Sequence, residues 1–256
     1  MQAIEFLQQD NGVILGGPEE RRRLLDIACS LDTPSYYKHL LHYNRALKQR
    51  NQQIKTDIER QSDHRHIWNE ALIRYGCAII RSRREMIVLL ERYTRERLSM
   101  MGIADIDLRL LYKSLQEKNG ETLEECFEKN IHASAKREDI FKTTVIGPHR
   151  DTFVFLNHGR DMRDFSSQGQ IRMTIMAAKL ALAEFLHEQR GIHPVFLFDD
   201  VLLEIDPQNT ASILESFGDQ NQMFFTSTTL PDFEFFRKFS KKYFYRLKEG
   251  GQICHE

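Results

Sequence analysis

Pro194-Val195-Phe196-Leu197-Phe198-Asp199-Asp200 is the stretch that decides the fold. Its four successive apolar residues show no polar alternation, which is typical of a strand covered on both faces. Two carboxylates follow at the carboxyl end of the strand, where α/β proteins place their ligands. Such a pair suits Mg²⁺ and water around a transferred phosphoryl group, although two solvated acids in a loop would give the same pattern.

A second stretch lies upstream and opens a segment with helical apolar spacing: Asp164-Phe165-Ser166-Ser167-Gln168-Gly169-Gln170. It places a hydroxyl and free backbone N–H groups at a helix start, where the aligned peptide dipoles favour phosphate. An ordinary packing helix capped by Ser167 would explain the serine equally. Gly169 favours the phosphate interpretation, because glycine in a first turn costs up to about 1 kcal/mol relative to alanine and usually marks the close approach of another group. Together the two stretches predict a nucleotide-handling site.

Composition narrows the class of protein. The chain has 256 residues, 41% of them apolar and 29% charged, with a formal net charge of −1, so it is not a generic polyanion binder and any DNA contact must come from a local patch. It has no long apolar run and no signal-peptide pattern, so we expect a cytoplasmic protein without a membrane partner. The four cysteines lie far apart and are expected to be reduced thiols, and two histidine pairs, at 39/42 and 64/66, lack a third ligand for zinc.

The order of the predicted elements divides the chain into residues 1–33, 34–138 and 139–256. The Gly16-Gly17-Pro18 turn predicts a helix start in the first part. The second part is predicted to be helical almost throughout from Ser35 to about Met101. It holds one long amphipathic helix, with apolar residues spaced from Trp68 to Tyr93, and a partner helix over Tyr36–Lys55; shorter helices are expected over 103–136. The third part alternates, with strands predicted at 141–146, 152–156, 194–199, 222–227 and 242–247 and helices at 165–190 and 207–217. This order predicts an α/β lobe with an inserted helical lobe.

These stretches belong to a series of blocks that resembles the RecF family of ABC-type, SMC-like ATPases. The series comprises Gly16–Arg23 with Asp26, Tyr43–Asn51, Gly147–Asp151, Ser166–Arg172, Phe198–Asp206 and Phe225–Thr228. The blocks keep the family's order and span nearly the whole chain, and the combination is more specific than any one of them. The resemblance implies an α/β ABC-type ATPase lobe, incomplete at its start, in residues 1–33 and 139–256, with a helical lid or hairpin lobe inserted over 34–138.

The resemblance also implies a composite nucleotide site. The signature residues would bind the γ-phosphate of ATP held by the opposite subunit, which makes dimerisation ATP-dependent; they are Ser167, Gln168, Gly169 and Gln170. Asp199 would be the Walker B residue that positions Mg²⁺ through water, and Asp200 would orient the attacking water, where many relatives carry glutamate. The D-loop and the switch would be supplied by Asp206 and by Thr226, Ser227 and Thr228.

One expected element is missing from the sequence. It contains no G-x-x-x-x-G-K-[S/T] loop, which would cradle the α- and β-phosphates and supply a lysine to the γ-phosphate. The chain therefore resembles a family member without its N-terminal portion. We expect that the complete protein is an ATPase and that this chain alone is not. A nucleotide-independent DNA- or protein-interaction module derived from the same fold is the alternative.

DNA binding is a further expectation. Local basic patches can neutralise phosphates, although alternating charges are also usual on a solvated helix face. The candidates are Arg21, Arg22, Arg23, Lys48, Arg50, Arg81, Arg83 and Arg84. The family resemblance implies binding at single-strand/double-strand junctions, a role in DNA replication, repair and the SOS response, and work with RecR and RecO in loading the recombinase.

Overall fold

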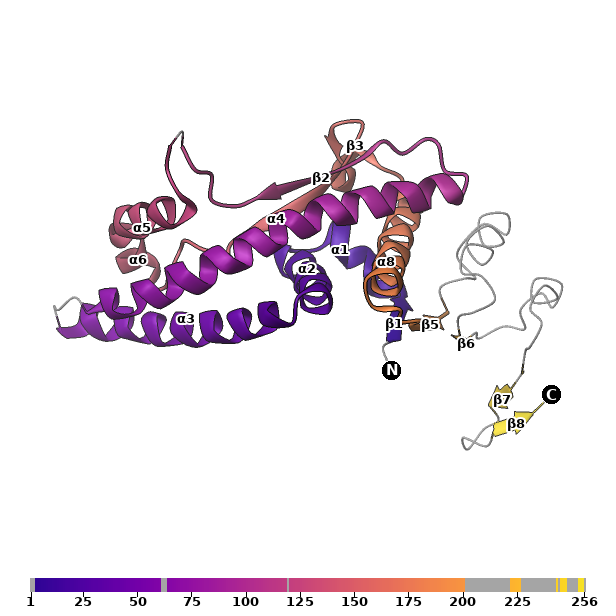
Figure 1. Cartoon of the computed structure of the whole chain (residues 1–256), viewed down its shortest axis with the longest axis horizontal. Coiled ribbons are helices and arrows are strands. Elements are labelled where there is room, and N and C mark those ends of the chain that lie inside the picture. Colours follow the sequence, from indigo (N-terminus) through magenta and orange to yellow (C-terminus); the bar gives the residue numbers. More distant parts are fainter. Residues whose placement is uncertain are drawn as a thin grey trace.

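Long helices join two three-stranded β-sheets, and a separate two-stranded ribbon lies towards the end of the chain, as Figure 1 shows. The computed structural model describes residues 3–60, 64–118, 120–200, 222–226, 243, 245–247 and 253–255. The mixed helix and strand content agrees with the predicted α/β lobe carrying an inserted helical lobe. Within the described residues, no helix is both long enough and apolar enough to cross a membrane.

The first sheet is parallel, with strand order β1-β5-β6. Its strands are β1 (Ala3–Leu7), β5 (Val195–Asp199) and β6 (Met223–Thr226). The register aligns Phe6 with Phe198 and Phe198 with Phe225, and the Phe198 ring stacks on both partners at centroid distances of 4.6 and 4.8 Å. The predicted strands at 194–199 and 222–227 are confirmed. β1 was not among the strands predicted from the sequence.

Long helices occupy the part of the chain that follows. After η1 (Gln8–Asn11) and α1 (Gly12–Leu15), α2 (Pro18–Asp32) starts with Pro18 in its first turn, as the Gly-Gly-Pro turn predicts. The two predicted long helices are confirmed within the span expected to be helical: α3 (Pro34–Arg60), which continues past Lys55, and, after η2 (Arg65–Trp68), α4 (Asn69–Met100). These two helices pack along each other and form the elongated part of the molecule (Figure 1).

A second sheet is antiparallel and corrects two predictions. It pairs β2 (Leu108–Lys113) with β3 (Thr152–Asn157), which pairs with β4 (Arg160–Asp161). Residues 103–136 were expected to be helical, yet β2 lies there because Leu108 and Leu110 alternate with exposed neighbours; α5 (Leu123–Ala133) follows. The predicted strand at 141–146 is wrong, since α6 (Ala135–Phe141) ends there and Lys142 takes a left-handed φ of 53°.

One helix connects the two sheets. After the short α7 (Met162–Phe165), α8 (Gln168–Arg190) begins beside β3, runs against α4 and ends beside β1 and β5 (Figure 1). A two-stranded ribbon of β7 (Tyr245–Leu247) and β8 (Ile253–His255) lies towards the end of the chain and includes part of the strand predicted at 242–247. The helix predicted at 207–217 lies outside the described residues. The boundary at residue 138 stays a prediction, and β2 and β3 pair across it.

Candidate functional site

The two predicted carboxylates stand at the carboxyl edge of the parallel sheet. The register places Asp199 between Leu7 and Thr226, and the Thr226 hydroxyl donates a hydrogen bond of 2.6 Å to Asp199 Oδ1. Asp200 follows with a left-handed φ of 55°, and its backbone N–H donates to the Thr226 carbonyl oxygen at 3.3 Å. Asp199 and Asp200, predicted from one block, and Thr226, predicted from another, are thus brought together by one pair of strands.

The chemistry of this edge fits a divalent cation. Asp199 is exposed, and its hydrogen bond to Thr226 uses one carboxylate oxygen. Mg²⁺ keeps several waters and usually takes only one or two protein carboxylates together with substrate phosphates, so the exposed Asp199 with the half-buried Asp200 beside it is sufficient. Within the described residues, no three His, Cys, Asp or Glu side chains gather into a ready-made metal cage. The ion would therefore be held jointly with a phosphate.

The predicted signature segment starts α8 with a capping box. The Ser167 hydroxyl accepts a hydrogen bond of 3.2 Å from the Gln170 backbone N–H, and the Gln170 side-chain oxygen accepts one of 3.0 Å from Ser167 N–H. The Gln170 amide also donates to Asp105 Oδ2 at 2.7 Å, which attaches the helix start to the loop before β2. Ser167, Gln168 and Gly169 are exposed. A Cβ placed on Gly169 would meet only Ser167 Oγ, at 3.9 Å, so nothing in its described surroundings requires a glycine.

The signature segment and the carboxylate edge belong to different parts of the fold. The start of α8 lies by the antiparallel sheet, whereas Asp199 and Asp200 end a strand of the parallel sheet (Figure 1). Asp206, Ser227 and Thr228 lie outside the described residues. The start of α8 and the carboxylate edge are therefore two separate sites, at opposite ends of α8.

A buried network joins several of the recognition blocks, and its role was not anticipated from the sequence. The Arg83 guanidinium, in α4, donates to Asp26 Oδ1 at 2.7 Å, to the Tyr36 hydroxyl at 3.0 Å and to the Pro148 carbonyl oxygen at 2.7 Å. Tyr36 also donates to Asp26. The network ties α2, α3 and α4 to the segment at 147–151, so Asp26 and Pro148, which come from separate blocks of the sequence, meet at one buried guanidinium.

A second buried network holds Thr144, which lies shortly before the segment at 147–151. Arg50 forms a two-pronged ion pair with Glu138, at 2.8 and 2.9 Å, and also donates to the Thr144 hydroxyl. Asn51 Oδ1 accepts from the Thr144 backbone N–H at 2.8 Å. Residues Arg50 and Asn51 are therefore part of the fold's scaffold, a role that the pattern of charges did not reveal.

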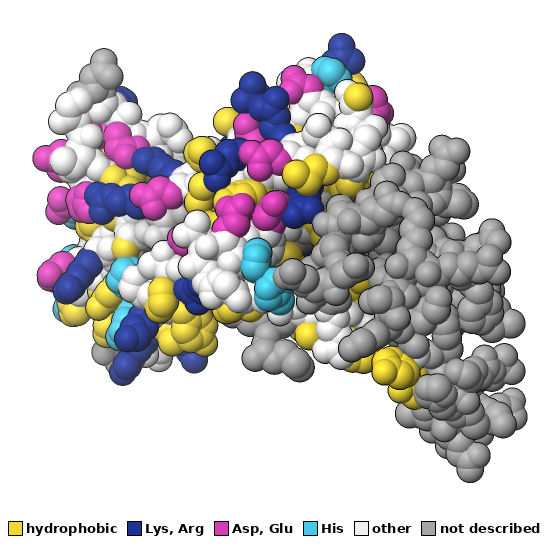
Figure 2. Space-filling view, turned by 45° about the vertical axis from the view of Figure 1, so that its right-hand side comes forward, with side chains coloured by type: hydrophobic (Ala, Val, Ile, Leu, Met, Phe, Trp, Pro, Cys, Tyr) yellow, Lys and Arg dark blue, Asp and Glu magenta, His cyan; other side chains and the backbone are white. Residues whose placement is uncertain are grey.

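The structure narrows the predicted DNA-binding set. Arg21, Arg50 and Arg83 are each at most 4% exposed, and Arg21 is held by the carbonyl oxygens of Val13, Ile14 and Gly16. These three were wrong as DNA contacts, because their guanidinium groups are buried and donate hydrogen bonds to partners inside the protein. Three more already have partners: Arg84 with Glu117, Arg81 with Glu124, and Arg22 with the Asp151 carbonyl oxygen. Arg23 and Lys48 remain exposed. Figure 2 shows acidic and basic side chains interleaved over much of one face.

Two buried titratable groups of the Gly147–Asp151 block respond to pH in opposite directions. His149 Nε2 lies 3.0 Å from the Thr144 carbonyl oxygen and must donate to it, so Nδ1 accepts from the Tyr43 hydroxyl at 2.6 Å. Burial lowers the pKa of this neutral imidazole from 6.5 to about 4. Burial raises the pKa of the Asp151 carboxyl, which accepts from the Tyr112 hydroxyl, from 3.8 to about 6.

We therefore expect these two groups to offset each other in acid. His149 stabilises the fold above pH 6.5 and loses that contribution as the pH falls towards 4, because only the unfolded state then binds the proton. Asp151 costs stability above pH 6 and is relieved as the pH falls towards 3.8. Each effect is worth about 3 kcal/mol. An Asp151→Asn variant should thus lose about 3 kcal/mol more than the parent chain between pH 7 and pH 4, measured by urea unfolding; parallel pH profiles would contradict this.

Comparisons with known proteins identify relatives over almost the whole chain. The chain is 33% identical over 244 residues to the DNA replication and repair protein RecF of Natranaerobius thermophilus, covering 91% of this chain and 63% of that protein. It is 31% identical to RecF of Prosthecochloris aestuarii, over 93% of this chain and 66% of that protein. The chain thus spans just under two thirds of these curated relatives. No protein-family model matches.

Solved structures agree with these sequence relatives. The recombination mediator protein RecF with ATP, in the RecFOR pathway, superposes with a TM-score of 0.86 at 27% identity, covering 100% of this chain and 68% of that one. The Smc head domain of Pyrococcus furiosus, at a TM-score of 0.50 and 15% identity, shares the fold alone. The ABC-type ATPase fold expected from the sequence is therefore confirmed.

Proposed function

The chain belongs to the RecF family, and on that premise we propose that it supplies part of a composite nucleotide site in an ATP-gated, DNA-binding dimer. The family supports a role in DNA replication and repair. The observation that carries the finer proposal is the α8 start, where Ser167, Gln168 and Gly169 are exposed and no described neighbour accounts for the glycine. A phosphate held by a second subunit would account for it.

In the proposed dimer, each group of residues has one task. The signature residues Ser167, Gln168, Gly169 and Gln170 bind the γ-phosphate of the opposite subunit's ATP through the backbone N–H groups of Gln168 and Gly169, which the capping box does not use, and Asp206 lines the seam beside them. Mg²⁺ neutralises phosphate charge when bound, and Asp199 positions it through water. Asp200 orients the attacking water, and Thr226, Ser227 and Thr228 serve as the switch. The hydrogen bond from Thr226 to Asp199 supports this assignment, because it couples the switch to the carboxylate.

The cellular role follows from the family. We propose that the complete protein acts in the cytoplasm in the response to DNA damage. It would bind single-stranded DNA or junctions of single and double strands, and would cooperate with mediators of the RecR and RecO type to load a recombinase. These partners are proposed for the whole protein, because the curated relatives are longer than this chain.

The division of labour between subunits can be tested by ATP binding and dimerisation. The 256 residues contain no phosphate-binding loop, so titration calorimetry of this chain with MgATP should show no micromolar binding; such binding would contradict the proposal. Reading the coding region upstream of Met1 should reveal a G-x-x-x-x-G-K-[S/T] motif. An in-frame stop without it would favour the nucleotide-independent interaction module.

A second test uses a longer chain that includes the phosphate-binding loop. It compares substitutions at two similar helix N-caps, Ser167 and Thr122. Ser167→Arg should abolish ATP-dependent dimerisation, measured by light scattering, while leaving ATP binding intact, because the blocked surface belongs to the opposite subunit's nucleotide. Thr122→Arg is the control, since Thr122 caps α5 with the same capping box and its loss costs a similar amount of stability, about 1 kcal/mol. Equal dimerisation of the two variants would refute the role of Ser167.

A further inference from the structure

Helix α3 concentrates positive charge over most of its length, ahead of the two acids, Asp57 and Glu59, in its last turn. From Pro34 to Thr56 it contains Lys38, Arg45, Lys48, Arg50 and Lys55 and no aspartate or glutamate. Arg50 is buried and neutralised by Glu138, which leaves the other four cations. This concentration is unusual in a chain whose formal net charge is −1. It is the kind of local patch that a near-neutral protein needs in order to bind a polyanion.

The four remaining cations form one exposed row. Lys38, Arg45, Lys48 and Lys55 are all exposed, and their spacings of seven, three and seven residues place them along one side of the helix. None of them has an ion-pair partner within the part of the chain that the structure describes. At about 1.5 Å per residue the row extends over about 25 Å. Such a row offers fixed positive charge along a straight line.

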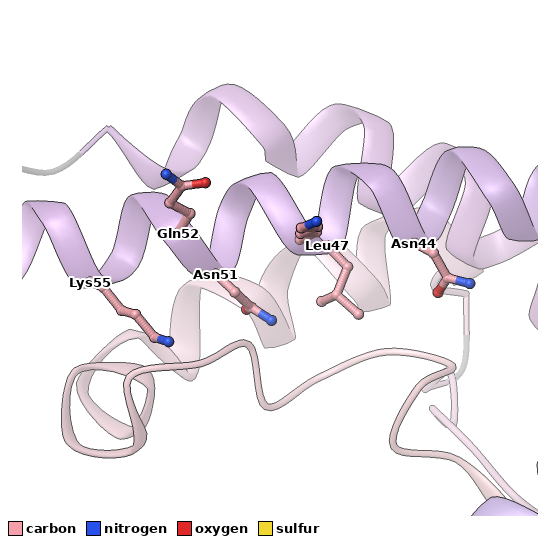
Figure 3. Close-up of a pocket in the computed structure, with 6 residues that line it drawn as sticks. Asn44, Leu47, Asn51, Gln52 and Lys55 are labelled. Carbon is pink, nitrogen blue, oxygen red and sulfur yellow. The ribbon is translucent and has the colours of Figure 1, made fainter.

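A groove of about 440 Å³ adjoins the row (Figure 3). Its lining comes from α3: Asn44, Leu47, Lys48, Asn51, Gln52 and Lys55. The segment that follows α6 is attached to this helix through the bond from Thr144 to Asn51, and it brings a further exposed cation, Arg150, which donates to the Thr144 carbonyl oxygen at 3.3 Å. The groove therefore combines amide groups and lysines, both of which donate hydrogen bonds to phosphate oxygens.

We propose that this α3 face, formed by Lys38, Arg45, Lys48, Lys55 and the adjoining groove, binds the phosphate backbone of duplex DNA. The length of the row matches about seven phosphates of one strand, at about 3.4 Å each. Duplex is favoured over single-stranded DNA because α3 exposes a single aromatic side chain, Tyr37, whereas single-strand proteins stack successive bases on several aromatics. The inference rests on the proposed DNA-binding function. It assigns that function to a surface that contains Lys48 but none of the arginines expected from the sequence.

The salt dependence of binding tests this assignment. Fluorescence anisotropy of a labelled 20-base-pair duplex would be measured with the purified chain between 50 and 200 mM salt. Each phosphate contact contributes about −0.9 to the slope of log K against log salt, so changing all four cations to glutamine should make the slope shallower by about 3 to 4. Over that range of salt, the parent chain should lose about a hundredfold more affinity than the variant. A single-stranded probe should show a smaller difference.

A second variant controls for net charge. Arg95, Lys113, Lys118 and Lys129 are exposed cations outside α3, and changing them to glutamine removes the same charge. The slope of log K against log salt for this control variant should differ from that of the parent chain by no more than about 1. Duplex binding with the same slope in the parent and in the α3 variant would overturn the assignment while leaving DNA binding by the family intact. The α3 row belongs to a single chain and needs neither ATP nor a second subunit. No duplex binding by the parent chain at 50 mM salt would therefore overturn the assignment, but neither the ATP-gated DNA binding proposed for the complete protein nor the nucleotide proposal.

Discussion

An Arg83→Met variant is expected to lose about 3–5 kcal/mol of unfolding free energy, measured by urea denaturation at pH 7. The Arg83 side chain is 2% exposed and holds Asp26, Tyr36 and the Pro148 carbonyl oxygen in one network. Methionine fills much of the volume but cannot donate a hydrogen bond. The Asp26 carboxylate and the carbonyl oxygen would then be left in a largely dry environment without their donor, which is the costly case for a buried pair.

Arg81 supplies the matched control, because it lies two residues away on the same helix. Its ion pair with Glu124 is also short, at 2.6 Å, but the two side chains are 52% and 44% exposed. Solvent screens such a pair, so Arg81→Met should change stability by no more than about 1 kcal/mol. If the two variants were equally destabilised, the loss would come from replacing any arginine of α4 by methionine and not from breaking the buried network.

The same comparison explains where sequence reasoning about charge fails. Arg83 and Arg84 are neighbours in the sequence, yet Arg83 is buried in a network and Arg84 reaches Glu117 at the surface. A helix rotates successive residues by about 100°, so adjacent arginines necessarily face different surroundings. Only the packing partners decide which face is buried. The predicted DNA-binding arginines therefore had to be sorted by the structure.

The nucleotide-site motifs were predictable because their determinants are local. Ser167 and Gln170 form the capping box within four residues, and the uninterrupted apolar run before Asp199 specifies a covered strand. Pairing of β5 with β6 then aligns Asp199 with Thr226, as expected for neighbouring parallel strands. The roles assigned to these residues remain proposals, since position alone does not establish catalysis.

The segment around Thr144 shows why the remainder could not be predicted. Its β-branched and aromatic residues favour a strand by propensity, but the Thr144 backbone N–H donates to Asn51, and its hydroxyl accepts from Arg50. Both partners are more than ninety positions away in the sequence. Glu138, which neutralises Arg50, lay outside every block that carried the family resemblance. Long-range polar contacts of this kind override local propensity and leave no periodic signal.

Gly147→Ala is expected to be as damaging as the loss of Arg83, at about 3–5 kcal/mol. Gly147 has a φ of 127°, which side chains rarely adopt, and this conformation alone costs on the order of 1–3 kcal/mol. A Cβ at this position would also overlap Tyr43 Oη and stand 3.0 Å from Phe127 Cζ. Both rings are buried, and Tyr43 is held by His149, so neither can move aside cheaply.

Two further variants distinguish the cost of the positive φ at Gly147 from the cost of the overlap with Tyr43. Gly120 has a φ of 79°, and a Cβ placed there meets nothing within 4 Å, so Gly120→Ala should cost only about 1–2 kcal/mol. Adding Tyr43→Phe to Gly147→Ala removes the overlapping oxygen, and the two changes should then be less destabilising together than the sum of each alone, by at least about 1 kcal/mol. Additive losses would mean that the left-handed backbone, and not the Tyr43 hydroxyl, requires glycine. A positive coupling would show that Gly147 serves to admit the Tyr43–His149 hydrogen bond, and with it the attachment of the 147–151 segment to α3.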